Sequence, residues 1–318
     1  MMQLLISGSQ KQIWTAEHSN LLVYSSVWSC DEWSPLKEII VGTLKDYKQY
    51  NHYSHYCKDN SFLDDIYSEV QEGLDTFQNI LEKNGVKVYR PHGLCYNVRD
   101  CAIVIGDTIV EAPMRYREEY HFLDSLKPIF YNKMLMGAKW ISAPKPTWKN
   151  INEPIFDGAN ICKLGDEMIF SVNETANRDG REWIQKVFPD INLHYVSQHA
   201  KISHIDTTYV PLSKDTVMIN GERVTKIHDV FKDWNHIIIE RDDLVDEDVS
   251  TMNRCAGIFI GMNTLSLNQR DVFVNASQTK LIEKLEKHNF NCIEVPLKHT
   301  RLLSGGLHCC TLDLVRES

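Results

Sequence analysis

Pairs of short apolar runs, separated by tight turns, recur along this chain. Each pair consists of one run, a turn that contains aspartate, and a second run rich in branched or aromatic residues, which is the pattern of a β-hairpin. The segments with this pattern are 99–113, 156–172, 205–221 and, more weakly, 262–276. Their starts lie roughly 50 to 60 residues apart, which indicates a repeated structural unit.

A helical pattern and then a short strand follow each hairpin. The clearest helix is predicted from about Ser61 to Asn84, because apolar residues recur there at every third or fourth position. Ser61 can cap its start, and Gly85 can end it. Further helices are predicted at 119–137, where Pro128 should kink or delay the helix, and at 181–188, 226–234 and 279–289.

The repeated unit is therefore strand, strand, helix, strand, but the chain has one internal hairpin too few for its five helix–strand pieces. Pairing of 34–44 with the C-terminal run 309–315 would supply the fifth hairpin. That pairing closes a ring of five ββαβ units and removes the exposed edges of an open array. We therefore predict an α/β fold, a five-bladed α/β propeller, over a generic mixed domain whose hairpins are coincidental.

Composition excludes several classes of protein. The 318 residues are 43% hydrophobic and 24% charged, as in ordinary globular proteins, and the net charge of −9 argues against a general nucleic-acid surface. No run approaches the roughly 18 apolar residues of a membrane span, and the apolar start lacks the basic region of a signal peptide. We therefore expect a cytoplasmic protein with no nucleic-acid or membrane partner.

The cysteines do not follow a structural pattern. Apart from the adjacent Cys309 and Cys310, the nine cysteines are scattered at wide intervals, and no two form a C-x-x-C pair. This spacing predicts neither a disulfide framework nor a structural zinc site, so most of the thiols should be small buried residues.

Closure of the ring would bring equivalent positions of the five units together near its centre. Those positions hold Asp100, Asp157, Asp206, Asn263 and Cys309. Gathered carboxylates repel one another unless a cation lies between them. A metal is one candidate cation, and a guanidinium, whose planar N–H donors fit carboxylates, is the other.

A histidine beside one of these positions suggests proton transfer. His204 and Asp206 would share one face of a strand, so His204 could protonate a departing amine and later deprotonate an incoming nucleophile. A guanidinium next to Cys309 would favour its thiolate, which makes this cysteine a candidate nucleophile. Each of these residues alone has an ordinary structural explanation, and their equivalent positions favour a shared site.

Six segments, in this order along the chain, carry a family resemblance. They are EWSPLKEIIVG (32–42), RDCAIVIGDTIVEAPM (99–114), GAKWISAPKPT (137–147), EPIFDGANI (153–161), HIDTTY (204–209) and GGLHCCTLD (305–313). Together they resemble the amidinotransferase family, which includes the glycine and inosamine-phosphate amidinotransferases. The resemblance implies the pentein fold, a five-bladed α/β propeller, with one catalytic domain over 23–318 after a tail at 1–22.

The resemblance also implies an activity and residue roles. It implies transfer of the amidino group of L-arginine to an amine acceptor, with release of ornithine, by a homodimer that needs no metal or organic cofactor. The catalytic residues that it implies are Cys309 as the nucleophile, His204 as the general acid and base, and Asp157 as the carboxylate that orients this histidine. The substrate-binding residues that it implies are Asp100 and Asp206 for the guanidinium, Arg223 for the substrate carboxylate, and Ser203 near the acceptor. From the residues alone, Arg223 fits a solvated turn, and His308 and Cys310 are expected to serve packing and turn geometry.

Departures from the family pattern lie where the acceptor is chosen. Asn160 replaces a second acid, Ser203 replaces the methionine of glycine-using members, and 256–257 replaces a pair of serines. The acceptor is therefore open, and the small Ser203 indicates a pocket roomier than glycine requires. Other readings are an arginine hydrolase of the deiminase type, a non-enzymatic binder of guanidino compounds, and a metal-dependent hydrolase, for which the histidines lack ligand spacing.

Overall fold

The structure is a computed structural model that describes residues 26–47, 60–116, 119–147, 152–197, 204–246 and 255–317. The domain boundary expected between residues 22 and 23 lies outside these ranges. Within them, no helix is long and apolar enough to cross a lipid bilayer.

The described strands form five sheets of three strands each, all with the same pattern. In every sheet the middle strand pairs antiparallel with one neighbour and parallel with the other. In their spatial order the sheets are β15 (Thr311–Arg316), β1 (Leu36–Val41) and β2 (Lys87–Tyr89); β3 (Ala102–Ile105), β4 (Thr108–Glu111) and β5 (Lys139–Ser142); β6 (Ile161–Lys163), β7 (Glu167–Val172) and β8 (Asn192–Ser197); β9 (Tyr209–Ser213), β10 (Thr216–Asn220) and β11 (Asn235–Ile239); β12 (Leu265–Ser266), β13 (Asp271–Asn275) and β14 (Asn291–Val295).

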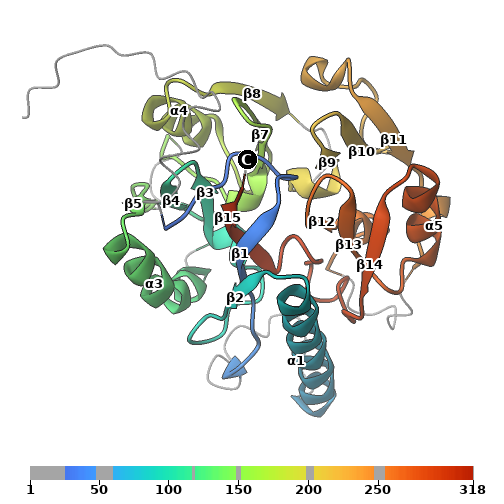
Figure 1. Ribbon diagram of the computed structural model, residues 1–318. Helices are drawn as coiled ribbons and strands as arrows, with labels where there is room; N and C mark the ends of the chain where they lie inside the picture. Colours follow the sequence, from blue (N-terminus) through green and yellow to red (C-terminus); the bar gives the residue numbers. More distant parts are fainter. Residues whose placement is uncertain are drawn as a thin grey trace, which may run out of the picture.

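The two ends of the chain complete the ring. β1 pairs antiparallel with β15, with Leu36 opposite Arg316 and Val41 opposite Thr311. Figure 1 shows these two strands side by side in the middle of the view, with the long helices outside the sheets. The predicted pairing of the N-terminal and C-terminal runs and the five-bladed α/β propeller are therefore confirmed.

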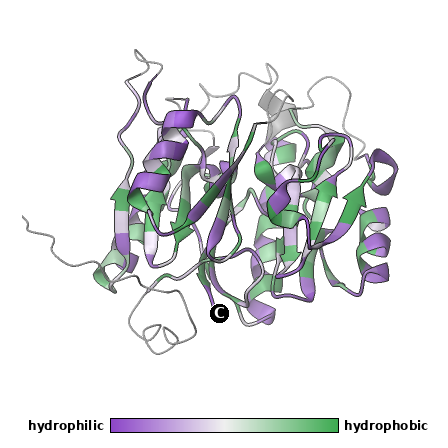
Figure 2. Cartoon of the chain, turned by 90° about the horizontal axis from the view of Figure 1, so that it is seen from above, coloured by the Kyte–Doolittle hydropathy of each residue, from purple (hydrophilic) through white to green (hydrophobic). Residues whose placement is uncertain are grey.

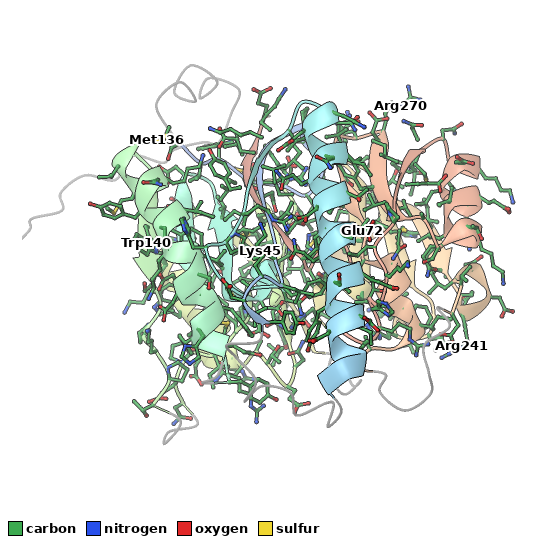
Figure 3. The ribbon with its side chains drawn as sticks, turned by 90° about the horizontal axis from the view of Figure 1, so that it is seen from below. Lys45, Glu72, Met136, Trp140, Arg241 and Arg270 are labelled. Carbon is green, nitrogen blue, oxygen red and sulfur yellow. The ribbon has the colours of Figure 1, made fainter. Side chains whose placement is uncertain are left out.

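Four longer helices connect the second and third strands of their blades. They are α1 (Asn60–Lys83), α3 (Tyr120–Leu135), α4 (Arg178–Val187) and α5 (Thr279–Lys287). The buried stripe of α1 packs against β1 and β13, and Gly85 ends this helix with a φ of 80°. Figure 3 shows the outer face of α1, where the exposed Glu72 is labelled. The hydropathy colours of Figure 2 show the same division, with green strands and purple outer faces of the helices.

Two helix predictions were wrong in detail. The segment 226–234 holds only a 3₁₀ turn, Asp229–Phe231, whose single buried residue is Phe231, so it lacks the apolar stripe that would hold a longer helix. α3 runs from Tyr120 across Pro128 to Leu135, so Pro128 does not delay this helix. Burial of Leu126, Ile129 and Phe130 offsets the cost of about 3 kcal/mol that an interior proline brings.

A buried cluster of charges joins three blades. Asp313 on β15 accepts hydrogen bonds from Arg99 at 2.6 Å, Lys163 at 2.7 Å and Arg316 at 3.1 Å. These four side chains are at most 1% exposed. Burial alone would raise the pKa of Asp313, but the three cations hold it well below its ordinary value. This ion cluster fixes the strand that follows Cys309.

Candidate active site

The five equivalent positions lie in short turns just before the first strand of each blade. The turns are α2 (Val98–Cys101) with Asp100, η4 (Gly158–Asn160) capped by Asp157, η5 (Ile205–Thr207) with Asp206, η8 (Ile258–Met262) ending at Asn263, and the turn at Cys309 before β15. The expected equivalence of these positions in the repeat therefore matches the structure.

His204 and Asp206 do not lie on a strand, so that part of the prediction was wrong. His204 is the residue before η5, and the turn forms because the N–H of Thr208 donates to the carbonyl of Ile205 at 2.8 Å. The hydroxyl of Thr207 also donates to the carbonyl of His204 at 3.3 Å. A ring nitrogen of His204, a carboxylate oxygen of Asp206 and the sulfur of Cys309 nevertheless lie within 4.8 Å of one another.

The cysteine is held by its backbone. The N–H groups of His308 and Cys309 both donate to Oδ1 of Asn263, each at 2.9 Å. A Cβ on Gly306 would stand 2.7 Å from the Cβ of Asn263, so this close approach requires glycine. Cys309 is 2% exposed, and its Sγ lies 3.4 Å from Oδ2 of Asp206.

The imidazole of His204 lies between two carboxylates. Its Nε2 is 3.0 Å from Oδ2 of Asp157, and its Nδ1 is 3.5 Å from Oδ1 of Asp100. Burial opposes protonation, but Asp100 and the hydrogen bond to Asp157 raise the pKa of His204 well above its ordinary value. These carboxylates therefore favour the protonated ring, which could act as a proton donor.

The carboxylates differ in charge state although they share one site. Burial raises the pKa of Asp100 to about 7, and Asp157 and Asp206 add to this shift while His204 opposes it. Asp206 is more deeply buried, at 4% exposure, and burial again opposes ionisation, but hydrogen bonding to His308 lowers its pKa to about 2. Buried oxygens without a hydrogen-bond partner among the described residues include Oδ1 of Asp100, of Asp157 and of Asp206. Such acceptors suit a ligand with several N–H donors and a positive charge.

The thiol is protonated in the protein alone. Burial, helped by Asp206, raises the pKa of Cys309 to about 12, and His204 only partly opposes this. A cation bound among the carboxylates would reverse that balance and favour the thiolate. The cluster is not fully enclosed by the described residues, since the side chains of His204 and Asp100 are 21% and 19% exposed.

A small cavity lies against Asp206 but not against the sulfur of Cys309. Its volume is about 20 Å³, and Glu32, Asp206 and His308 are among its lining residues, whereas Cys309 is not. This space fits about one water molecule. Within the described ranges, the side chains that could together hold a metal ion are His204, Asp206 and Cys309. The two ring nitrogens of His204 already face carboxylates, however, so this set fits metal binding less well than guanidinium binding.

Arg223 lies in a turn after β10 but is not simply solvated. Its NH1 donates to the carbonyl oxygen of Thr207 at 3.1 Å and to the hydroxyl of Thr207 at 2.8 Å. The guanidinium therefore packs against the turn that carries Asp206. Ser203 lies outside the described residues.

One of the family departures has a structural explanation. The side chain of Asn160 accepts the N–H of Asp157 at 2.8 Å, so it stabilises the turn that positions this carboxylate. The Ala256 N–H donates to the carbonyl of Arg301 at 2.9 Å, a backbone contact that does not explain the departure at 256–257.

Sequence reasoning missed three residues of the site. Glu32 and His308 form a hydrogen-bonded chain with Asp206, at 3.3 and 2.8 Å. Glu119, just before α3, has a pKa raised to about 9 by burial and by Asp157 and Asp100, and its Oε2 is buried without a partner among the described residues. Glu32 and Glu119 lie far from the repeat positions, so no spacing signal identifies them.

Comparison with known proteins places this geometry in a family. Inosamine-phosphate amidinotransferase 1 from Streptomyces griseus is 30% identical over an alignment of 340 positions, gaps included. The alignment covers 91% of this chain and 96% of that protein. The chain belongs to the amidinotransferase family. An L-arginine:L-lysine amidinotransferase from Pseudomonas savastanoi pv. phaseolicola is 28% identical over 92% of this chain and 95% of that protein.

Solved structures agree with the sequence comparison. The structure of an inosamine-phosphate amidinotransferase from Streptomyces griseus matches this amidinotransferase with a TM-score of 0.83 and 28% identity, over 92% of this chain and 98% of that one. The propeller described above is therefore the pentein fold of these enzymes. No family model matches the chain.

Proposed function

We propose that this amidinotransferase moves the amidino group of L-arginine to an acceptor amine through a covalent amidino-cysteine at Cys309, with release of ornithine. One observation carries the proposal: within the described residues, buried carboxylate oxygens that make no hydrogen bond lie near the sulfur of Cys309 and the ring of His204. Such a site matches a planar cation in both charge and hydrogen bonding. The name of the Pseudomonas relative, an L-arginine:L-lysine amidinotransferase, supports arginine as the donor.

The first half-reaction begins when the guanidinium binds among Asp100, Asp157 and Asp206. Its charge, added to that of His204, favours loss of the proton of Cys309 to solvent. The sulfur then forms a bond to the guanidinium carbon, and the bond from this carbon to the chain nitrogen of arginine breaks. His204 gives its proton to that nitrogen, so ornithine leaves as an amine.

The second half-reaction reverses these roles with a different amine. The neutral His204 takes a proton from the acceptor nitrogen, which bonds to the amidino carbon. The carbon–sulfur bond breaks, and the electrons return to the thiolate of Cys309. Since donor and acceptor use one site in turn, the kinetics should be ping-pong.

The acceptor is an amine of a natural-product or amino-acid pathway in this proposal. Glu119 adds a carboxyl whose Oε2 is buried and makes no hydrogen bond within the described residues, so amines with a second positive charge belong in the tested panel. Lysine, ornithine, glycine and an aminocyclitol cover the acceptor classes that the family resemblance suggests.

The decisive experiment supplies guanidino-labelled arginine with this panel and identifies the labelled products by mass spectrometry. Labelled guanidino products and unlabelled ornithine are expected. Formation of citrulline and ammonia at a rate that no amine changes would instead indicate a deiminase-type hydrolase. Cys309→Ala should abolish transfer with an unchanged circular dichroism spectrum, and full activity of this variant would refute the nucleophile assignment.

The remaining predictions concern the whole chain. We propose one catalytic domain over 23–318, a homodimer, and a cytoplasmic location. A chain that begins at residue 23 should retain full activity, and sedimentation should give twice the monomer mass. Loss of activity on truncation, or a monomer at working concentrations, would contradict these statements.

A further inference from the structure

A chain of three buried side chains lies behind the guanidinium site. Nδ1 of His308 is 2.8 Å from Oδ2 of Asp206, and Nε2 of the same ring is 3.3 Å from Oε2 of Glu32. The three residues are 8%, 4% and 6% exposed. The sequence analysis expected only packing and turn geometry from His308, and the contacts of its ring go beyond that expectation.

The far end of this chain is fixed. Oε1 of Glu32 accepts the backbone N–H of Lys163 at 3.1 Å. Burial opposes ionisation, but the charge of Lys163 and the hydrogen bond to His308 lower the pKa of Glu32 to about 2. Glu32 is therefore a carboxylate in a defined position, and it can orient the ring of His308.

The near end presents one oxygen of Asp206 to the site. The two ring nitrogens of His308 face one carboxylate each, which fixes the orientation of the ring between Asp206 and Glu32. Oδ2 of Asp206 is occupied by His308 and faces the sulfur of Cys309, whereas Oδ1 is buried without a partner among the described residues. Rotation of the carboxylate would break the bond to His308, so the ring keeps Oδ1 available.

We propose that His308, oriented by Glu32, is a positioning residue that holds the Asp206 carboxylate so that its free oxygen receives the guanidinium of the donor. This inference rests on the proposed function, because it takes Asp206 as a guanidinium ligand.

Asparagine and glutamine separate the two ends of the chain. The amide nitrogen of asparagine lies as many bonds from the backbone as Nδ1 of histidine, and that of glutamine as many as Nε2. His308→Asn can therefore keep the bond to Asp206, while His308→Gln reaches toward Glu32 and loses it. A role in packing alone predicts no such order, because both amides fill part of the same space.

The experiment measures L-arginine binding by calorimetry in Cys309→Ala protein, and arginine KM and kcat in protein with Cys309 intact. We expect His308→Asn to bind arginine within about 3-fold of the parent, and His308→Gln and His308→Ala to bind at least about 10-fold more weakly, since a hydrogen bond to a charged group is lost. The loss should appear mainly in KM. His299→Asn is the matched control, because this histidine pairs with Glu69 at the surface and its φ of 59° suits asparagine.

The outcomes are distinct. Equal affinities of the Asn and Gln variants, or unchanged binding in all three, would overturn the positioning role. Should the Gln and Ala variants fail to fold, Glu32→Gln replaces them, with a raised arginine KM expected and an unchanged KM overturning the inference. If the arginine affinities of the variants follow the predicted order but arginine adds no mass to Cys309 in the parent protein, the proposed transfer is refuted and the positioning role is not. An absence of arginine binding to the parent would overturn both.

Discussion

Asp313→Asn tests whether the buried ion cluster stabilises the ring. Asparagine keeps the shape of aspartate but removes the anion that Arg99, Lys163 and Arg316 share at 2.6 to 3.1 Å. The three cations cannot reach solvent, because their side chains are at most 1% exposed. The substitution therefore leaves buried positive charges that repel one another.

The expected loss follows from this burial. Removing one partner of a buried ion pair costs about 3–5 kcal/mol of the free energy of unfolding, whereas an exposed pair contributes about 0.2–1 kcal/mol. The pKa of Asp313 is held well below its ordinary value, so its stabilisation is present at neutral pH and is lost only as the pH falls below about 4.

Urea unfolding near neutral pH, followed by circular dichroism, measures the difference. Asp124→Asn is the matched control, since this aspartate is 61% exposed and pairs with Lys127 on the surface of α3. We expect a loss of at least about 3 kcal/mol for Asp313→Asn and less than about 1 kcal/mol for the control. Equal losses in the two variants would refute the reasoning that the cluster is a buried, mutually dependent unit.

Three further predictions concern the active site. Asp157→Asn removes the anion at Nε2 of His204 and should lower kcat about 10²- to 10⁴-fold in steady-state assays, and a loss below about tenfold would contradict its orienting role. The Asp100 carboxyl, with a pKa of about 7, should bind guanidinium better once ionised, so arginine KM should fall as the pH rises from about 6 to 8. Asp100→Asn should flatten that profile, and an unchanged slope would exclude this residue as its source. Gly306→Ala places a Cβ 2.7 Å from that of Asn263 and should slow labelling of the enzyme by arginine about 100-fold, whereas normal labelling would show that the turn tolerates a side chain.

The blade pattern could be predicted because its signals are local. Hairpin turns, apolar runs and the helical stripe of α1 each lie within one short stretch, and five repeats reinforce them. Closure of the ring could also be predicted, because one hairpin was missing from the repeat and the two terminal apolar runs could form it, as the pairing of β1 with β15 confirms. The equivalent positions of the repeat then predict, from the residues alone, that Asp100, Asp157, Asp206 and Cys309 share one site.

What the sequence could not show depends on long-range contacts. The Glu32–His308 pair joins residues 276 positions apart, and neither its spacing nor its residue types distinguish it from packing. The turn at His204 depends on hydroxyl and backbone hydrogen bonds that override the strand pattern. Arg223 fits a solvated turn by composition, and only its contacts with Thr207 place it beside the site.

The most direct test of the central claim is a trapped intermediate. Protein mixed with guanidino-labelled arginine in the absence of an acceptor is quenched in acid, and the intact and digested masses are measured. The account predicts one added amidino group on the peptide that contains Cys309, its loss on later addition of a suitable amine, and none in Cys309→Ala. Ornithine released in step with labelled product, but with no label on that peptide, would contradict it.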